Sequence, residues 1–250
     1  MSLRSIVRRG YEAARRLALS ATAPRADRAY LARDVPAPVR AGHNTLVQAL
    51  LELADKPGAR ILEIGSRQVS SAYVLPDHLK HADYVGFDFY PGANVDVVGD
   101  AHRLSDLVEG PFDAVYSTAV FEHLAMPWVA AEEIAKVLKV GGHVFIETHF
   151  SFSSHERPWN FFQFSDMGLR ALFSPALGFE CVEAAMDNPI VGRFSAFAAP
   201  YLRFQRVTGL YCHSLFIGRK ARDVPGFRWR DVALEAVVGE TTYPPPAAGQ

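Results

Sequence analysis

Two short apolar runs open the most regular part of the sequence. Residues 60–64 read Arg-Ile-Leu-Glu-Ile and are followed by Gly65, and residues 84–88 read Tyr-Val-Gly-Phe-Asp. Continuous apolar runs of this length are typical of strands that are covered on both faces of a sheet. Glycine suits a sharp turn where a ligand approaches the backbone. The pattern therefore predicts two parallel strands whose carboxyl ends face a ligand.

The alternation of apolar strands with helices continues along the chain. We predict further strands at 95–98, 114–117, 143–148, 180–185 and 213–217, and helices at 44–53, 71–75, 102–107, 128–138 and 166–173, with Asn44 and Ser165 as helix caps. Strands that alternate with helices favour a parallel sheet with helices on both faces. Residues 188–209 are too many for a hairpin loop and indicate an inserted helix or lid.

The N-terminal residues 1–40 differ from the rest in charge. They hold nine arginines, no lysine and three acidic residues. On a helical wheel Leu3, Ile6, Val7, Tyr11, Ala14, Leu17 and Ala18 share one arc, and arginines fill the other. Such a basic amphipathic helix can pack on the domain, dock on an anionic membrane surface or serve as an organelle targeting peptide. The prolines of Val35-Pro-Ala-Pro38 indicate a linker after it.

Composition narrows the function classes. The formal net charge of −1 gives no global attraction for nucleic acid. No apolar run approaches the roughly 18 residues of a membrane span. Cys181 and Cys212 lack metal or redox spacing, so we expect buried thiols in a reducing, cytoplasmic compartment and no metal site. The proline-rich residues 243–250 predict a disordered tail.

The turn at Gly65 limits the kind of nucleotide ligand. Asp88 ends the second predicted strand, where nucleotide-binding sheets place a carboxylate against ribose hydroxyls. A dinucleotide fold would also need G-x-G-x-x-G, but Gly65 is followed by Ser66, Arg67 and Gln68. The pattern favours a nucleoside ligand without phosphates, which disfavours a nucleotide-dependent oxidoreductase or isomerase.

Three further motifs follow in order. They read Asn-Val-Asp-Val-Val-Gly-Asp-Ala-His-Arg-Leu at 94–104, Phe-Asp-Ala-Val-Tyr-Ser-Thr-Ala-Val-Phe-Glu-His-Leu at 112–124 and Glu-Ile-Ala-Lys-Val-Leu-Lys-Val-Gly-Gly-His-Val-Phe-Ile-Glu at 133–147. Over residues 59–173 the chain thereby resembles class I S-adenosylmethionine-dependent methyltransferases. The resemblance implies an α/β, Rossmann-like, doubly wound fold: a mostly parallel seven-stranded sheet whose last strand is antiparallel.

The resemblance also implies the domain limits and the cofactor site. The methyltransferase domain would span residues 41–222, between an N-terminal helical extension at 1–40 and a C-terminal extension at 223–250. S-adenosyl-L-methionine would contact Glu63, Gly65 and Ser66 with its methionine part, Asp88 with its ribose, Asp100 and Ala101 with its adenine, and Thr118 and Ala119 at the floor of the pocket. The run Gly65-Ser-Arg-Gln68 departs from the Gly-x-Gly-x-Gly of many members.

Methyl transfer needs few catalytic groups beyond those that hold the acceptor near the methyl carbon. A hydroxyl acceptor gains from a general base, and histidine suits that role near neutral pH. His123, His149 and His155 follow predicted strand ends and are the candidates. His123 can instead be structural within Phe121-Glu-His-Leu124.

The segment 155–165 reads His-Glu-Arg-Pro-Trp-Asn-Phe-Phe-Gln-Phe-Ser. It resembles the segment after the fifth strand in methyltransferases that accompany glycan-building enzymes, with Asn160 and Gln163 in place of an acid and an arginine. Its aromatic residues can stack on a sugar or ring acceptor, or pack in the core. The function we expect is O-methylation of a small molecule or glycan, with no nucleic-acid partner. The alternative is a degenerate member that binds the cofactor or a partner without turnover.

Overall fold

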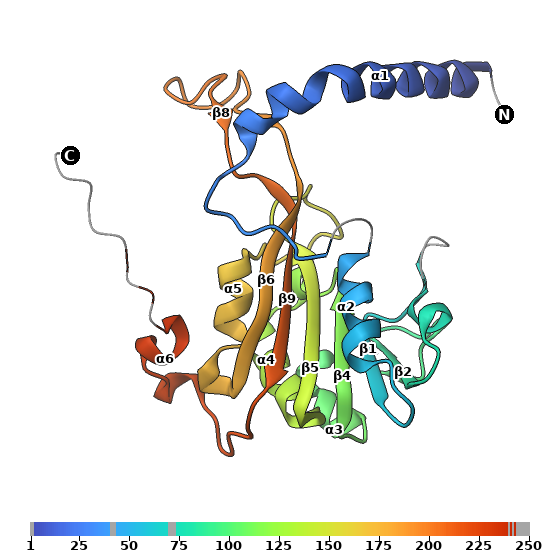
Figure 1. The fold of residues 1–250 in the computed structure, drawn as a ribbon, viewed down its shortest axis with the longest axis vertical. Helices are drawn as coiled ribbons and strands as arrows, with labels where there is room; N and C mark the ends of the chain where they lie inside the picture. The colour runs from blue at the N-terminus through green and yellow to red at the C-terminus, as the bar shows by residue number, and fades with distance from the viewer. Residues whose placement is uncertain (1–2, 41–43, 70–73, 240, 242, 244–250) are drawn as a thin grey trace. The chain divides into compact units, whose positions relative to one another are not determined.

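The computed structural model describes residues 3–40, 44–69, 74–239, 241 and 243. The chain forms two compact units (Figure 1). The smaller unit combines Met1–Val35 with Asn188–Tyr211, and the larger unit combines Pro36–Asp187 with Cys212–Gln250. The first division falls within the predicted linker, and the segment expected as an insert is grouped with the N-terminal segment.

A twisted sheet forms the centre of the larger unit. Over the described residues it has seven strands in the order β3-β2-β1-β4-β5-β9-β6. The bounds are β1 Arg60–Ile64, β2 Asp83–Asp88, β3 Val97–Val98, β4 Phe112–Thr118, β5 Leu138–His149, β6 Phe179–Pro189 and β9 Tyr211–Lys220. The pairs β3–β2, β2–β1, β1–β4 and β4–β5 are parallel, and β9 is antiparallel to β5. The predicted fold class is confirmed.

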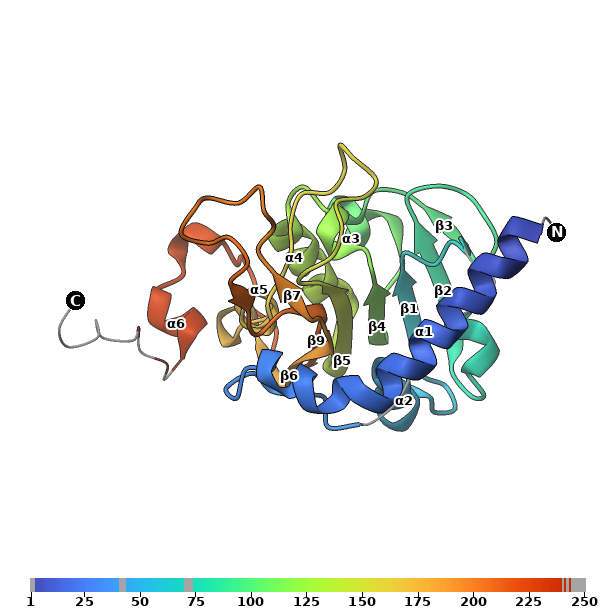
Figure 2. The ribbon, with the colours of Figure 1, turned by 90° about the horizontal axis from the view of Figure 1, so that it is seen from above.

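Helices cover both faces of this sheet (Figure 2). The covering helices are α2 Thr45–Ala54, α3 Leu104–Leu107, α4 Pro127–Val137 and α5 Asp166–Leu172, and α6 Leu234–Val238 packs beside α5. The short 3-10 turns are η2 Leu75–His78, η3 Ala101–Arg103, η4 Phe121–His123, η5 Pro175–Leu177 and η6 Trp229–Asp231. Successive residues of a strand face opposite sides. In β1, Ile61 therefore packs in the core under α2 and Leu62 in the core under α4 and α5. This two-sided burial explains the continuous apolar runs.

Several local predictions needed correction. Asn44 precedes α2 but has a left-handed backbone (φ 62°) and makes no side-chain cap hydrogen bond. Ser165 does cap α5, because its Oγ accepts a hydrogen bond from the Gly168 N–H at 3.1 Å. The helix predicted at 71–75 falls mostly outside the described residues. Cys181 is exposed and Cys212 half-buried, so the prediction of two buried thiols was wrong.

The smaller unit brings together two segments that are remote in the sequence. Its elements are α1 Leu3–Asp27, η1 Arg28–Tyr30, β7 Gly192–Arg193 and β8 Arg206–Val207. β7 and β8 pair as an antiparallel hairpin, where we had predicted a helix or lid. The Gly209 N–H donates to the Tyr30 carbonyl at 2.8 Å, and the Arg206 guanidinium lies 5.5 Å from the centre of the Tyr30 ring. The C-terminal residues predicted as disordered lie, except for Tyr243, outside the described residues.

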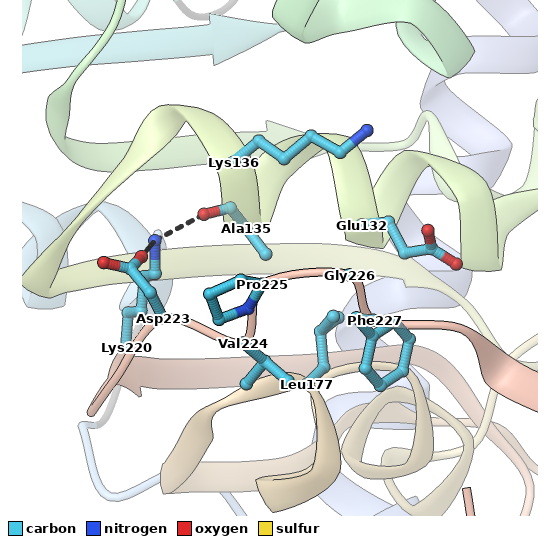
Figure 3. A pocket seen from close by; sticks show the side chains of 10 residues that line it. All are labelled: Glu132, Ala135, Lys136, Leu177, Lys220, Asp223, Val224, Pro225, Gly226 and Phe227. Carbon is cyan, nitrogen blue, oxygen red and sulfur yellow. Dashed lines mark hydrogen bonds and ion pairs between the residues drawn. The ribbon is translucent and has the colours of Figure 1, made fainter. Parts of the chain in front are cut away.

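A buried lysine ties the last strand to α4. Lys220 Nζ donates to the carbonyls of Ala135 at 2.6 Å and Leu138 at 2.7 Å, and it lies 2.6 Å from Asp223 Oδ1. The two carbonyls belong to the carboxyl end of α4, where a cation is favoured. A neighbouring hollow of about 290 Å3 is lined by α4 and by residues 223–227 (Figure 3). Because β9 ends and β5 begins here, this hollow lies at the edge of the sheet opposite the predicted cofactor site.

Candidate functional site

The turn after β1 is tightly fixed at the carboxyl edge of the sheet. The N–H groups of Gly65 and Ser66 both donate to the Phe87 carbonyl, at 2.8 and 3.1 Å. Gly65 has φ 86°, and a Cβ built there would lie 2.3 Å from Val120 Cγ2. Only glycine fits this position without a shift of the neighbouring loop.

The end of β4 closes against this turn. Ala119 adopts a left-handed backbone (φ 54°), and its N–H donates to the Glu147 carbonyl at 3.0 Å. Thr118 Oγ1 is buried there, and among the residues that the structure describes it has no hydrogen-bond partner. A buried hydroxyl without a partner is uncommon in a folded protein and fits a position that a ligand completes.

Glu63 lies on β1, two residues before the turn. The Tyr84 hydroxyl donates a hydrogen bond of 2.5 Å to Glu63 Oε2. Burial raises the pKa of Glu63 to about 7, and the hydrogen bond from Tyr84 offsets only part of this effect. A buried carboxyl of this kind ionises more readily when a cation is placed beside it. The ammonium of a bound amino acid moiety would be such a cation.

Asp88 already has partners at the end of β2. Its carboxylate accepts hydrogen bonds from the backbone N–H of Tyr90 at 2.9 Å and of Arg67 at 3.3 Å. The Arg67 Nε also lies 3.3 Å from Asp88 Oδ1. The arginine that replaces a family glycine in the turn therefore contacts the carboxylate predicted to bind ribose.

Asp100 fixes the connection after β3. Its Oδ1 accepts hydrogen bonds from the His102 N–H at 3.0 Å and from His102 Nδ1 at 2.6 Å. Burial alone would raise the pKa of Asp100, but these hydrogen bonds outweigh it and hold the pKa below its usual value. His102 Nε2 accepts from the Met126 N–H at 3.1 Å, which joins the turn to the start of α4. Ala101 is buried beside it.

The predicted cofactor residues thus lie along one edge. Glu63, Gly65 and Ser66 come from the end of β1 or its turn, Asp88 from β2, Asp100 and Ala101 from the turn after β3, and Thr118 and Ala119 from β4. These four strands are neighbours and run parallel, so their carboxyl ends meet at the same edge. The buried Thr118 hydroxyl, the Gly65 turn and the raised pKa of Glu63 fit a nucleoside that carries an amino acid.

The buried Glu122 orients His149, one of the three predicted histidines. His149 ends β5, and its Nδ1 lies 2.6 Å from Glu122 Oε1. Thr148 Oγ1 donates to Glu122 Oε2, also at 2.6 Å. Burial would raise the pKa of Glu122, but the interactions with His149 and Thr148 outweigh it and lower the pKa. Glu122 is therefore ionised, and it favours the tautomer in which His149 Nε2 carries the free lone pair.

The other two predicted histidines join His149. The rings of His155 and His149 are 5.2 Å apart between centroids, and those of His155 and His123 are 4.8 Å apart. His155 Nδ1 donates to the Ser153 carbonyl at 2.9 Å. His123 Nδ1 contacts the Trp159 carbonyl, and its Nε2 lies 3.6 Å from Glu156 Oε2. The same Nε2 lies 3.8 Å from Glu122 Oε1, so two carboxylates approach the second nitrogen of His123.

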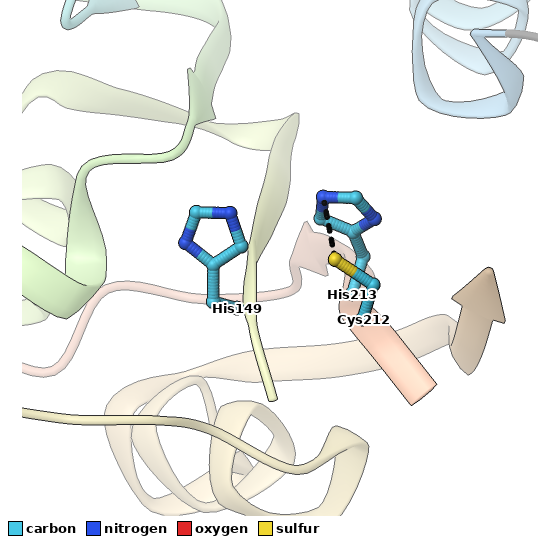
Figure 4. Close-up of side chains that lie close together, drawn as sticks. All are labelled: His149, Cys212 and His213. Carbon is cyan, nitrogen blue, oxygen red and sulfur yellow. Dashed lines mark hydrogen bonds between the residues drawn. The ribbon is translucent and has the colours of Figure 1, made fainter. Parts of the chain in front are cut away.

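Sequence reasoning missed a fourth histidine. His213 on β9 is paired with His149 in the antiparallel register, and the rings are 5.3 Å apart. The available signal was the antiparallel last strand, which places its first residues beside the end of β5. Burial lowers the pKa of His213 and so favours the neutral ring. Cys212 Sγ lies 3.5 Å from His213 Nε2 (Figure 4).

Two groups of side chains here have donor atoms close enough to hold a metal ion. Within the described ranges they are His149, Cys212 and His213, and Glu122, His123 and His155, with the donor atoms of each group within 4.8 Å of one another. The flanking sequence contains no familiar ligand motif. The absence of a metal site stays a prediction.

The aromatic side chains of segment 155–165, after β5, are of two kinds: some pack in the core and others are exposed, where they could stack on an acceptor. Phe164 is buried and lies 6.4 Å from Phe121 between ring centroids, so it belongs to the core. Trp159 and Phe161 are exposed, and the Trp159 ring lies 6.0 Å from Phe89, which follows β2. Exposed rings from two loops therefore meet at the edge that carries the predicted cofactor site.

Comparisons with known proteins agree with the fold. Residues 62–146 match the family model described as a methyltransferase domain. No curated protein sequence matches the chain. A S-adenosylmethionine-dependent methyltransferase from Archaeoglobus fulgidus is similar in structure, with 18% identity, a TM-score of 0.50 and coverage of 72% of this chain and 95% of that one.

Two further solved structures have the same fold. One is the Burkholderia thailandensis 1,6-didemethyltoxoflavin-N1-methyltransferase with bound 1,6-didemethyltoxoflavin and S-adenosylhomocysteine, at 15% identity and TM-score 0.50, covering 72% of this chain and 78% of that one. The other is a putative sarcosine dimethylglycine methyltransferase from Galdieria sulphuraria, at 14% identity and TM-score 0.50, covering 72% and 85%. At these identities the likeness shows the fold.

Proposed function

Because the chain carries a class I S-adenosylmethionine-dependent methyltransferase domain, we propose that it transfers a methyl group to a hydroxyl of a small ring-bearing molecule or a glycan. The observation that carries this proposal is the Glu122–His149 pair at the end of β5. A neutral imidazole with a buried carboxylate on one nitrogen is suited to accept a proton on the other. A hydroxyl acceptor loses its proton on methylation and therefore gains from such a group.

The cofactor is S-adenosyl-L-methionine. When bound it supplies a methyl group on a sulfonium, which needs no protonation of the leaving group. Glu63 would face the ammonium, Asp88 the ribose and the 100–101 turn the adenine. The backbone at Gly65 and the hydroxyl of Thr118 would line the remaining wall. The His102 ring holds the 100–101 turn in place, because its Nδ1 donates to Asp100 and its Nε2 accepts from the Met126 backbone N–H.

The histidines then have different roles. His149 Nε2 takes the proton of the acceptor hydroxyl, and the ionised Glu122 stabilises the imidazolium that results. His155 Nδ1 is held by a backbone carbonyl, which leaves its Nε2 to hydrogen-bond the acceptor. His123 links the turn η4 to the loop at Trp159 and so positions the other two.

The acceptor class rests on the exposed aromatic rings. Phe89 and Trp159 come from different loops and lie 6.0 Å apart at this edge. Exposed aromatic faces suit stacking on a sugar or an aromatic ring. Nearby histidines supply the polar contacts that a hydroxyl group requires.

The experiment has two stages. Calorimetric titration with S-adenosylmethionine, with NAD as the control ligand, tests the cofactor. Formation of S-adenosylhomocysteine is then measured with a panel of catechols, phenols and glycosides, against matched amines and thiols. Turnover with hydroxyl acceptors and none with amines supports the proposal. Turnover only with amines would contradict the acceptor class and leave the cofactor assignment intact.

One observation favours a second candidate, a protein that binds the cofactor or a partner without turnover. Arg67 contacts the Asp88 carboxylate, which we expect to bind ribose. Tight S-adenosylhomocysteine binding with no product from any acceptor would support this alternative.

A further inference from the structure

The smaller unit is strongly basic although the whole chain is nearly neutral. Residues 1–35 and 188–211 together contain eleven arginines, no lysine and three acidic residues. The larger unit contains fifteen basic and twenty-four acidic residues. The segment 188–211 adds three of these arginines and no acid. The positive charge is therefore concentrated in one unit that is assembled from two distant parts of the sequence.

This unit also exposes large apolar side chains. In α1 all residues from 11 to 20 are exposed, including Tyr11 and Leu17. On the helical wheel these two share an arc, and Arg15 and Arg16 lie outside it. In the β7–β8 hairpin the side chains of Phe197, Tyr201 and Phe204 are 97%, 74% and 62% exposed.

The hairpin loop is an ordered structure. Phe194 and Phe204 are joined by a backbone hydrogen bond of 3.1 Å, and Arg203 Nε donates to the Ala198 carbonyl at 2.9 Å. The Arg193 guanidinium lies 5.5 Å from the centre of the Phe204 ring. The loop thus holds its aromatic side chains outward beside its own arginines.

We infer that the smaller unit is a docking surface for an anionic lipid bilayer. Amphipathic helices with arginine on one face and leucine or aromatic residues on the other bind in the plane of the headgroups. Each arginine near an anionic surface adds attraction, and aromatic rings partition into the interfacial layer. Within the described ranges, every helix is too short or too polar to cross the bilayer, so this contact would be peripheral.

Charge alone would also suit a nucleic acid. Contacts with phosphate groups would account for the many arginines, and exposed aromatic rings can stack on bases. Leucine and alanine side chains along the apolar arc of α1 gain nothing from either contact, but they gain from burial at the acyl boundary. The combination therefore favours lipid.

The test uses the full chain and vesicles of phosphatidylcholine with or without phosphatidylglycerol. We expect flotation with the mixed vesicles only, and release at high salt. Phe197→Ser with Tyr201→Ser should reduce binding on the order of tenfold, because two apolar anchors are lost. Tyr243→Ser is the matched control, since Tyr243 is 97% exposed but belongs to the larger unit.

Two charge-reversal variants test whether the arginines of the smaller unit are needed for vesicle binding. Arg15→Glu with Arg16→Glu should reduce binding by at least about tenfold. Arg103→Glu with Arg230→Glu, also at exposed positions but in the larger unit, should leave it unchanged. Thermal unfolding of each variant checks the fold. Equal binding to neutral vesicles, no effect of the aromatic pair, or tighter binding to RNA than to vesicles would overturn the inference. Vesicle binding is measured without any methyl acceptor, so its result is independent of the proposed reaction.

Discussion

Arg67 Nε lies 3.3 Å from Asp88 Oδ1, so the residue that departs from the family's glycine-rich turn contacts the carboxylate expected to bind ribose. The Arg67 backbone N–H also donates a hydrogen bond to the side-chain Oδ2 of Asp88. The contact of the Arg67 N–H shapes the turn, whereas the guanidinium contact would compete with a bound ribose for the carboxylate oxygens.

We expect Arg67→Ala to strengthen S-adenosylmethionine binding several-fold, because it frees an acceptor oxygen and keeps the backbone contact. A partly exposed ion pair is worth about 1 kcal/mol or less, which sets this size. Asp88→Ala should weaken binding by about 1–3 kcal/mol. Isothermal titration measures both. Unchanged affinity in Asp88→Ala would remove Asp88 from the ribose site.

Glu63 should make stability depend on pH. Burial raises its pKa to about 7, so between about pH 4.5 and 7 the folded state keeps a proton that the unfolded state has lost. The free energy of unfolding therefore falls as pH rises through this range, by about 3 kcal/mol for this group. Glu63→Gln should remove that loss, which urea unfolding at pH 5 and pH 8 can measure.

Glu147 is the matched control for Glu63. Burial and the nearby Asp187 charge raise the pKa of Glu147 to about 7 as well. Glu147→Gln should change the pH dependence of stability in the same direction. Only Glu63→Gln should weaken S-adenosylmethionine binding at pH 8, where the wild-type carboxylate is ionised. Equal weakening by both variants would contradict the position of Glu63 at the ammonium.

His149→Gln should lower kcat about 10²- to 10⁴-fold and leave S-adenosylmethionine affinity unchanged, because it removes the proton acceptor but no cofactor contact. His123→Gln is the comparison within the cluster and should have a smaller effect, since His123 positions the loop. Steady-state formation of S-adenosylhomocysteine gives both values. A full rate in His149→Gln would eliminate it as the base.

Gly65→Ala should destabilise the domain by about 2–4 kcal/mol, from the left-handed backbone and the clash with Val120 Cγ2. Gly58→Ala separates these causes: Gly58 has φ 77° but open space around it, so only about 1 kcal/mol is expected. Val120→Ala should restore part of the loss in Gly65→Ala. If both substitutions lower the free energy of unfolding equally, as measured by urea unfolding, the clash with Val120 does not contribute to the loss in Gly65→Ala.

Lys220→Met should lower the free energy of unfolding by about 2 kcal/mol or more, because the carbonyls of Ala135 and Leu138 lose their donor in a buried place. Asp223→Asn removes only the exposed partner and should cost less than about 1 kcal/mol. Chemical denaturation of the two variants compares them. A larger loss in Asp223→Asn would reverse this assignment.

The sheet could be predicted from sequence because its strands are covered on both faces. Continuous apolar runs at 60–64 and 84–88 have no amphipathic helical alternative, and β1 begins and ends at the predicted residues. Asn44 shows the limit of such local signals: a cap residue type was present, but the chain entered α2 through a left-handed backbone. Cap chemistry states what a side chain can do, whereas the direction of chain entry depends on distant packing.

Contacts across the sequence were beyond local patterns. The three predicted histidines met because strand ends share an edge, but His213 required knowing the register of β5 with β9. The Arg67–Asp88 contact depended on the conformation of a turn that composition does not specify. The association of residues 188–211 with the N-terminal segment rests on contacts such as Gly209 with Tyr30, which no periodicity indicates.

Residues 188–211, which contain the β7–β8 hairpin, connect β6 to β9, and these two strands are neighbours in the sheet. A variant without residues 188–211 would therefore need only a short turn to join Asp187 to Cys212, and the strand order would not change. Deleting residues 1–35 alone would leave the hairpin without its Tyr30 partner and with its aromatic loop still attached. In protein engineering, residues 1–35 and 188–211 should therefore be transferred or deleted together.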